Sequence, residues 1–327
     1  MTERENDEKW MRRCLDLARC GRYGAPPNPM VGAVIVHDGR ILGEGYHARC
    51  GEAHAEVNAV RAVREADKAL LSASTLYVSL EPCAHYGRTP PCAELIARLG
   101  IRRVVVGCVD PFARVQGRGI AMLREAGCDV TVGVLEAECR ELNRRFITCQ
   151  THHRPYITLK WAQSVDGFLD RRRTGGQPVA LSSPRTLMAV HRLRAQSGAI
   201  LVGHATLRLD RPRLDVRHWA GPAPLRLVLG RVAPDELPEG FEAFADRDDM
   251  LAELYRRGVQ TLLVEGGART LQSFIADGLW DEARVELAPQ TLGDGVAAPA
   301  MPAGAQRRVE THFGRPVVWY RRAGSLL

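Results

Sequence analysis

Cysteine is confined to one half of this 327-residue chain. All nine cysteines lie between Cys14 and Cys149, whereas four of the five tryptophans lie beyond residue 150. The chain is longer than one ordinary domain, and such a break in composition indicates two. We expect the first domain to span residues 1–150 and the second to span residues 151–327, with the junction close to residues 150–155.

Apolar runs and helical patterns alternate in both halves. Strands are predicted at 31–36, 75–80, 103–108, 156–161, 199–202, 225–229 and 261–264. Helices are predicted at 8–20, 54–66, 91–99, 119–126, 183–194 and 269–276. Ser182 or Ser183 is a candidate cap for the helix at 183–194. Strands that alternate with helices are typical of layered α/β domains. The acidic, weakly periodic segment 232–249 predicts a loop.

The composition limits the compartment and the partners. The first ten residues are polar and charged, and no run approaches the ~20 apolar residues that span a bilayer. We therefore expect a cytoplasmic protein that does not enter membranes, with its nine cysteines reduced. The formal net charge of +7 favours anionic partners. A phosphorylated metabolite and a nucleic acid both satisfy that condition.

A histidine, a glutamate and two cysteines form the strongest motif in the chain. His54-Ala-Glu56 is followed by Pro-Cys83 and then by Cys92. Zinc binds neutral imidazole and thiolate, and three protein ligands leave its fourth position open to water, as in catalytic sites. Glu56 follows His54 on the same predicted helical turn, so it can reach that water without being a ligand. A carboxylate there can take a proton from water and pass it to a leaving amine.

The same motif has a structural alternative. His47 or His85 could supply a fourth ligand and close the site, which would leave Glu56 without a role. The predicted helix that begins near Cys92 favours the first interpretation, because the positive end of a helix stabilises a thiolate.

The spacing of the two cysteines departs from the general zinc deaminase signature, H-x-E…P-C-x-x-C. Eight residues separate Cys83 from Cys92, and the whole stretch from Glu81 to Cys92 resembles the deaminase domain of bifunctional riboflavin biosynthesis deaminase–reductases. The segments 28–34, 45–47 and 51–56 resemble it as well. This resemblance implies that Asn28 and His47 contact the pyrimidine or its ribose, and that Arg88 lies near the substrate phosphate.

The second half resembles the reductase domain of the same family. The matching segments are 159–160, 164–167, 200–203, 206–212, 264–267, 280–282 and 287–289. The resemblance implies a dihydrofolate-reductase-like fold that uses NADPH. It implies cofactor contacts by Gln163, Thr206, Asp210, Glu265, Gly266 and Gly267. It assigns the ribityl phosphate to Arg194, Leu214 and Arg217.

Taken without the resemblance, this half is less specific. Gly266-Gly267 lies between a predicted strand and a predicted helix, where backbone N–H groups can bind a phosphate, although such a pair more often forms a tight turn. No G-x-G-x-x-G motif is present, which argues against an ordinary Rossmann site. The role of Lys160, a catalytic residue or a charge at a strand end, stays open.

Two features depart from the family. The tryptophan that the family often has near Ala180 is absent, and the segment 230–250 is shorter than expected. We therefore expect a strand and helix of the cofactor domain to be trimmed.

The resemblance implies a cytidine-deaminase-like three-layer α/β/α domain followed by a dihydrofolate-reductase-like α/β domain. The first would use zinc to deaminate 2,5-diamino-6-(5-phosphoribosylamino)pyrimidin-4-one hydrolytically. The second would use NADPH to reduce the ribosyl side chain to ribityl. We expect a small phosphorylated pyrimidine as substrate, no nucleic-acid partner and a homo-oligomer, a dimer or a tetramer. Two alternatives stand beside this: a second domain that only binds substrate or dimerises, and a deaminase of nucleic-acid bases.

Overall fold

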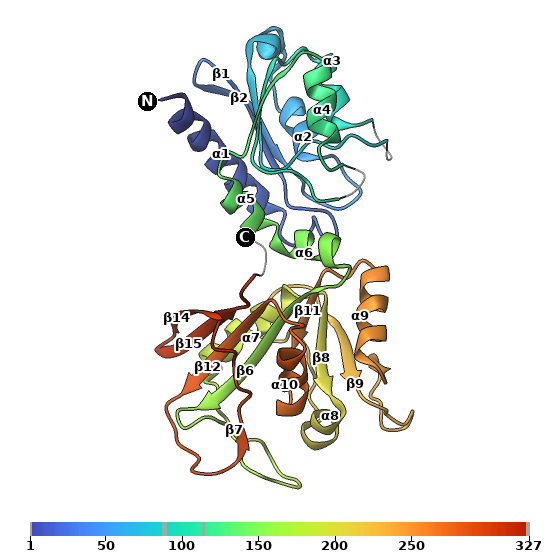
Figure 1. The fold of residues 1–327 in the computed structure, drawn as a ribbon, viewed down its shortest axis with the longest axis vertical. Coiled ribbons are helices and arrows are strands. Elements are labelled where there is room, and N and C mark those ends of the chain that lie inside the picture. The colour runs from blue at the N-terminus through green and yellow to red at the C-terminus, as the bar shows by residue number, and fades with distance from the viewer. Residues whose placement is uncertain (1, 87–89, 113–114, 325–327) are drawn as a thin grey trace. The chain divides into compact units, whose positions relative to one another are not determined.

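The chain folds into two compact units, with bounds Met1–His152 and His153–Leu326. The computed structural model describes residues 2–86, 90–112 and 115–324 (Figure 1). Among these residues, no helix has the length and the apolar character needed to cross a membrane.

A five-stranded sheet forms the centre of the first unit. Its strands are β1 (Gly32–His37), β2 (Arg40–Tyr46), β3 (Thr75–Val78), β4 (Arg103–Val106) and β5 (Asp129–Val132). They lie in the order β2-β1-β3-β4-β5. β1 is antiparallel to both β2 and β3, whereas β3, β4 and β5 are parallel. The carboxyl ends of β3 and β4 therefore meet at one edge of the sheet.

Helices cover both faces of this sheet (Figure 1). Alternate residues of β1 point to opposite sides, so Val34 packs with α1 (Glu3–Cys20) and α5 (Glu136–Leu142), and Ile35 packs under the other helices. Those helices are α2 (Ala55–Arg61), α3 (Cys92–Arg98) and α4 (Arg118–Glu125). The predicted three-layer arrangement is confirmed. The last helix of the unit is α6 (Arg144–His152).

The helix predicted over 54–66 is wrong in its extent. α2 ends at Arg61, and a 3₁₀ helix follows over Glu65–Ala73. The reason is the backbone of Arg64, which is extended at ψ 147° as the residue before this second helix. The Asp67 carboxylate accepts hydrogen bonds from Arg64 and Arg40, which holds the chain in the new direction.

The second unit contains an eight-stranded sheet in the order β10-β9-β8-β11-β6-β12-β15-β14. Its strands are β6 (Tyr156–Ser164), β8 (Ala199–Gly203), β9 (Leu225–Leu229), β10 (Phe241–Phe244), β11 (Thr261–Val264), β12 (Glu282–Ala288), β14 (Gln306–His312) and β15 (Arg315–Arg321). The first six strands in spatial order are parallel, and β15 and β14 add antiparallel pairs at one side. The short strands β7 (Phe168–Asp170) and β13 (Val296–Ala297) form a separate pair.

Two apolar layers enclose this larger sheet. On one face, Leu159 and Leu201 pack against α9 (Arg247–Arg256) and α10 (Ala268–Ala276). On the other face, Ile200 and Val202 pack against α7 (Pro184–Ala195) and α8 (His204–Asp210). Ser183 caps α7, since its side chain accepts a hydrogen bond from the Thr186 N–H.

The predictions for the segment 230–250 are wrong. The segment is neither a plain loop nor trimmed of its strand and helix, because it contains β10 and the start of α9. Its acidic residues form a helix cap: the Asp246 carboxylate accepts hydrogen bonds from the N–H groups of Asp248 and Asp249. Phe241 of β10 and Met250 of α9 are both buried, each in one of the two apolar layers that enclose the sheet.

Candidate functional site

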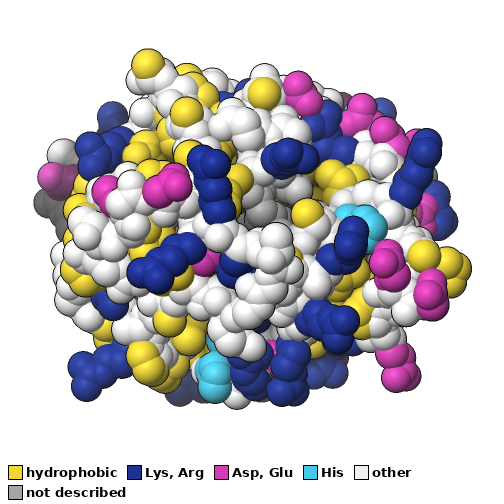
Figure 2. Space-filling view, turned by 90° about the horizontal axis from the view of Figure 1, so that it is seen from below, with side chains coloured by type: hydrophobic (Ala, Val, Ile, Leu, Met, Phe, Trp, Pro, Cys, Tyr) yellow, Lys and Arg dark blue, Asp and Glu magenta, His cyan; other side chains and the backbone are white. Residues whose placement is uncertain are grey.

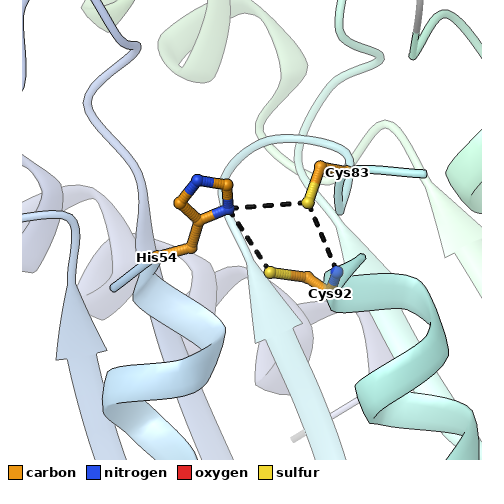
Figure 3. Close-up of side chains that lie close together, drawn as sticks. All are labelled: His54, Cys83 and Cys92. Atoms are coloured by element: carbon orange, nitrogen blue, oxygen red, sulfur yellow. Dashed lines mark hydrogen bonds between the residues drawn. The ribbon is translucent and has the colours of Figure 1, made fainter. Parts of the chain in front are cut away.

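His54, Cys83 and Cys92 converge at one point in the first unit (Figure 3). His54 is the residue that precedes α2, Cys92 is the first residue of α3, and Cys83 lies on the segment that leaves β3. His54 Nδ1 lies 3.5 Å from Cys83 Sγ and 3.4 Å from Cys92 Sγ. The three ligand atoms all lie within 4.8 Å of one another. Two helix starts and one strand end therefore bring a nitrogen and two sulfurs together.

This donor set fits zinc. One imidazole and two thiolates are ligands that zinc prefers, and three protein ligands characterise a catalytic site. Hydrogen bonds from Cys92 and His54 lower the pKa of Cys83 to about 4, which favours the thiolate that a metal needs. Among the described residues, no other cluster of three or more His, Cys, Asp or Glu side chains is placed to hold a metal. Neither His47 nor His85 belongs to the cluster.

Glu56 lies on the first turn of α2, two residues beyond His54. Its side chain is only 3% exposed. Burial, reinforced by the nearby Cys83, raises the pKa of Glu56 to about 7. A carboxyl with a pKa near neutrality is suited to accept a proton and then to donate it.

The buried His47 and the partly buried Asn28 form a hydrogen-bonded pair beside the cluster. The His47 ring lies edge-on to the His54 ring, with 5.3 Å between centroids. His47 Nδ1 lies 3.1 Å from the Ala53 carbonyl oxygen, which can only accept, so Nδ1 carries the proton. His47 Nε2 then accepts from the Asn28 side-chain N–H at 3.1 Å. Burial lowers the pKa of His47, in keeping with this neutral form.

Two buried carboxylates that the sequence did not single out lie near the cluster. Glu81 directly precedes Pro82-Cys83, and Asp110 follows β4. Burial raises the pKa of Asp110 to about 6. The one sequence signal for Glu81 is its place in the Glu81–Cys92 stretch. Arg88, which the family resemblance placed near the substrate phosphate, lies outside the described residues.

In the second unit, the residues predicted to contact NADPH share the carboxyl edge of the parallel strands. Gln163 lies near the end of β6, Thr206 and Asp210 lie in α8 directly after β8, and Glu265–Gly267 follows β11. The Gly203 N–H donates to the Gly266 carbonyl at 2.9 Å, which joins two of these segments. In open α/β sheets, ligands bind beyond the carboxyl ends of the strands.

Two glycines at this edge let the segment after β11 pass close to α8. A Cβ at Gly267 would lie 3.0 Å from Thr206 Oγ1, and Gly266 has a φ of 116° that favours glycine. Such a cradle before the start of α10 fits the phosphates of a dinucleotide, which bind to backbone N–H groups at a helix start.

Arg194 and Glu265 form a partly buried bidentate ion pair. Arg194 Nε and a terminal nitrogen lie 2.9 and 2.7 Å from the two Glu265 oxygens, and Arg194 also donates to the Asp215 carbonyl at 3.1 Å. Burial alone would raise the pKa of Glu265, but Arg194 and Lys160 beside it hold that pKa at about 2. The structure thus joins a residue predicted to bind substrate to one predicted to bind cofactor.

The remaining predicted residues have other surroundings. Leu214 is buried with a φ of 50°, and Arg217 forms an ion pair with Asp215. Asp210 accepts a hydrogen bond from Arg173. Gln163 accepts from the Trp161 indole at 2.8 Å.

A shallow groove lies where the family often has a tryptophan. It has a volume of about 280 Å³. Its lining residues are Ala162, Leu169, Val179, Ala180, Leu181, Ser182 and Leu187. All are small or aliphatic.

Two family models match the chain, one in each unit. The cytidine and deoxycytidylate deaminase zinc-binding region matches residues 4–108, and the RibD C-terminal domain matches residues 155–313. The riboflavin biosynthesis protein RibD of Aquifex aeolicus (strain VF5) is 39% identical, and the match covers 90% of each chain. RibD of Escherichia coli (strain K12) is 36% identical, with 88% of this chain and 89% of the relative covered.

Solved structures agree with these matches. A diaminohydroxyphosphoribosylaminopyrimidine deaminase/5-amino-6-(5-phosphoribosylamino)uracil reductase from Thermotoga maritima is 32% identical, with a TM-score of 0.87 over 98% of this chain and 100% of that chain. Acinetobacter baumannii RibD is 30% identical, with a TM-score of 0.85 over 98% and 99%. The cytidine-deaminase-like and dihydrofolate-reductase-like folds are confirmed. The chain therefore belongs to the RibD family of riboflavin biosynthesis proteins, with a zinc-binding deaminase domain and an NADPH-dependent reductase domain.

Proposed function

We propose that this enzyme carries out two successive steps of riboflavin biosynthesis. Residues 1–150 deaminate 2,5-diamino-6-(5-phosphoribosylamino)pyrimidin-4-one by hydrolysis. Residues 151–327 then reduce the ribosyl side chain of the product to ribityl with NADPH. The observation that carries the proposal is the convergence of His54, Cys83 and Cys92 beside the buried Glu56.

In the deaminase domain, His54, Cys83 and Cys92 hold the zinc. When bound, zinc activates water for hydrolysis at neutral pH. Glu56 would accept a proton from the attacking water and donate a proton to the departing ammonia, and its pKa of about 7 suits both transfers. Because water adds and ammonia leaves, the ring carbon exchanges an amine for an oxygen with no change of oxidation state.

Asn28 and His47 orient the pyrimidine or its ribose. The Ala53 carbonyl accepts a hydrogen bond from the His47 ring, and the ring in turn accepts one from the Asn28 side-chain N–H. The two side chains are therefore held in place before substrate arrives. Holding these groups in advance lowers the entropic cost of binding. We assign Arg88 to the substrate phosphate, whose geometry a guanidinium group matches.

In the reductase domain, NADPH supplies the hydride, and the protein supplies binding and orientation. We assign the cofactor to Gln163, Thr206, Asp210, Glu265, Gly266 and Gly267. We assign the ribityl phosphate to Arg194, Leu214 and Arg217. Basic side chains are spread over the face in Figure 2, which is seen from the lower end of Figure 1, where α8 and β7 lie. Arg171, Arg208 and Arg231, in the segments after β7, β8 and β9, are exposed, which favours anionic ligands.

Two assays on the intact wild-type chain test the proposal. Ammonia release is measured with the authentic diaminopyrimidinone, and NADPH oxidation is followed optically with the deaminated product. Both activities are expected. Failure to release ammonia would refute the deaminase assignment, and failure to oxidise NADPH would refute the reductase assignment.

A reductase-like domain that only binds substrate or dimerises is the second candidate. It rested on the missing tryptophan and on a trimmed segment, but β10 and α9 are present in that segment. The groove at Ala180, where the family often has a tryptophan, still favours this second candidate. The NADPH assay decides between the two.

We also propose that the protein works in the cytoplasm as a homo-oligomer. All nine cysteines are free thiols, which suits a reducing compartment. The edge strand β14 carries an exposed Val309, and Phe313 beyond it is also exposed. Exposed apolar side chains on an edge strand favour pairing with a second copy.

A further inference from the structure

We propose that Glu81 is a positioning residue for the zinc ligand Cys83. Its carboxylate fixes the segment that leaves β3, and this inference rests on the zinc site proposed above. Glu81 precedes Cys83 by two residues and has no partner of opposite charge among the described residues. It is nevertheless only 4% exposed. A buried carboxylate requires compensation, because burial without partners disfavours its charge.

Four backbone N–H groups supply that compensation. One Glu81 oxygen accepts from Asp110 N at 3.2 Å and from Gly117 N at 2.9 Å. The other accepts from Gly119 N at 3.0 Å and from Ile120 N at 3.3 Å. The carboxylate thus joins the loop after β4 to the first turn of α4. Hydrogen bonds of this kind, with an ionised acceptor, are stronger than neutral ones.

Helix α4 depends on this carboxylate for its N-terminal cap. Its cap residue is Gly117, which has a φ of 80° and no side chain to accept a hydrogen bond. Glu81, far away in sequence, bonds the N–H groups that a serine or an aspartate usually satisfies. The helix dipole and the carboxylate charge also attract each other.

The same helix turn lies against the peptide that connects Glu81 to Cys83. A Cβ at Gly119 would collide with the Pro82 carbonyl oxygen. Only glycine allows α4 to approach this closely, so the position of Pro82 is set by the helix that Glu81 caps. Moving Glu81 would therefore displace the residue directly before the ligand.

Cys83 has a second anchor on its other side. Its carbonyl accepts from Ala93 N at 3.2 Å, and its sulfur accepts from Cys92 N at 3.3 Å. Both donors belong to the start of α3. The Glu81 contacts and the α3 contacts together fix the ligand between two helix starts. Without the Glu81 contacts, Cys83 would be held from one side only, and its distances to His54 and Cys92 could vary.

The test compares Glu81→Gln with Asp7→Asn in the full-length protein. Glutamine keeps the size of Glu81 but turns an N–H₂ group toward two N–H donors. Asp7 is the matched control, because it is also 4% exposed and accepts hydrogen bonds from Tyr77 and Arg103 on strands of the same unit. Among the described residues, no hydrogen bond or ion pair joins Asp7 to the 79–83 segment or to α4.

Zinc affinity is measured by competition with a chromogenic chelator, and ligand geometry by the thiolate charge-transfer bands of the Co²⁺-substituted protein. We expect Glu81→Gln to weaken zinc binding by ~10–100-fold, the usual effect of losing a group that orients a ligand. Its charge-transfer bands should shift, and kcat for ammonia release should fall more than KM rises. NADPH oxidation should be unchanged, and Asp7→Asn should match the wild type in every zinc measurement.

Several outcomes would overturn the inference. The first is a Glu81→Gln variant whose zinc affinity and charge-transfer bands equal those of the wild type. The second is an equal loss of zinc affinity in Glu81→Gln and Asp7→Asn, which would indicate that Glu81 contributes to stability alone. If Glu81→Gln does not fold, Glu81→Asp, which keeps the charge at a shorter reach, takes its place under the same criteria. A wild-type chain that binds no zinc would instead refute the proposed function.

Discussion

Glu56 illustrates how a single residue acquires its chemistry from its surroundings. Its carboxyl is buried, and burial raises its pKa to about 7. Glu56→Gln keeps the shape of the side chain and removes the proton transfer. We expect zinc content and fold to persist while ammonia release falls by at least ~100-fold, the lower range for a lost general acid or base. Metal analysis and ammonia release check this, and near-normal ammonia release would refute the role of Glu56.

His191 should make the stability of the second unit sensitive to acid. Its ring is 1% exposed, and burial, together with the positive charge of Arg194, lowers its pKa to about 4. Unfolded histidine binds a proton near pH 6.5. Between pH 6.5 and 4 the unfolded state therefore binds more protons, so the free energy of unfolding falls as the pH falls.

His191→Phe should remove that dependence. The loss in the wild type is up to about 3 kcal/mol over this range, given 1.36 kcal/mol per pKa unit. Urea unfolding at a series of pH values, followed by tryptophan fluorescence, measures it, because four of the five tryptophans lie in this unit. Equal pH slopes in wild type and variant would contradict the assignment.

The residues of the metal cluster were predictable because their types identify them. Histidine, cysteine and glutamate at this spacing have few other uses, so His54, Cys83, Cys92 and Glu56 could be singled out from sequence. Glu81 could not be assigned a role. Its partners are backbone N–H groups some thirty to forty residues further along the chain, and backbone groups leave no mark on the sequence.

Among the elements, the start of β6 is held by one buried ion pair. Arg154 donates to both oxygens of Asp281 at 2.6 and 2.9 Å, and Asp281 also accepts from the Ile157 N–H at 2.7 Å. Removing one partner of such a pair leaves a buried charge without compensation. We expect Asp281→Ala to lower the free energy of unfolding of the second unit by about 3–5 kcal/mol.

The matched control is Asp277→Ala, which removes the exposed partner of Arg247. An exposed ion pair contributes only about 0–1 kcal/mol. Urea unfolding of both variants measures the difference, and zinc content and ammonia release should be intact in each. Similar midpoints for the two variants would show that the buried pair does not stabilise β6.

Helices and strands were predictable where the apolar pattern was regular, as in β9, whose bounds match the prediction. β2 was missed because Gly43 and Gly45 interrupt its pattern. The structure gives the physical reason. A Cβ at Gly43 would collide with the Ala59 carbonyl, and one at Gly45 would lie 2.5 Å from Ala59 N. These glycines let α2, the helix of Glu56, lie directly on the sheet.

For the whole molecule, we expect the two activities to be separable by substitution. Asp210→Ala and Arg217→Ala should cripple reduction while leaving zinc content and ammonia release intact, because both lie in the second unit. Arg217→Ala should weaken phosphate binding by roughly 2–3 kcal/mol, the contribution of a charge-assisted hydrogen bond. Asp210→Ala should disturb the cofactor.

Parallel assays of NADPH oxidation and ammonia release measure both effects. The KM for the deaminated substrate should rise in Arg217→Ala. Loss of ammonia release in either variant, with zinc retained, would mean that the two halves depend on each other. Ammonia release from tRNA or single-stranded DNA at the rate seen with the pyrimidine would refute the metabolite assignment.

The confinement of cysteine to the first unit also has a physiological consequence. Electrophilic toxins and soft metals such as cadmium react with thiols, and every thiol of this chain lies before residue 150. Poisoning by these agents should therefore silence the hydrolytic half and spare the redox half. A cell exposed to them would accumulate the substrate that still carries its amine. The reductase domain would remain active but would lack its substrate.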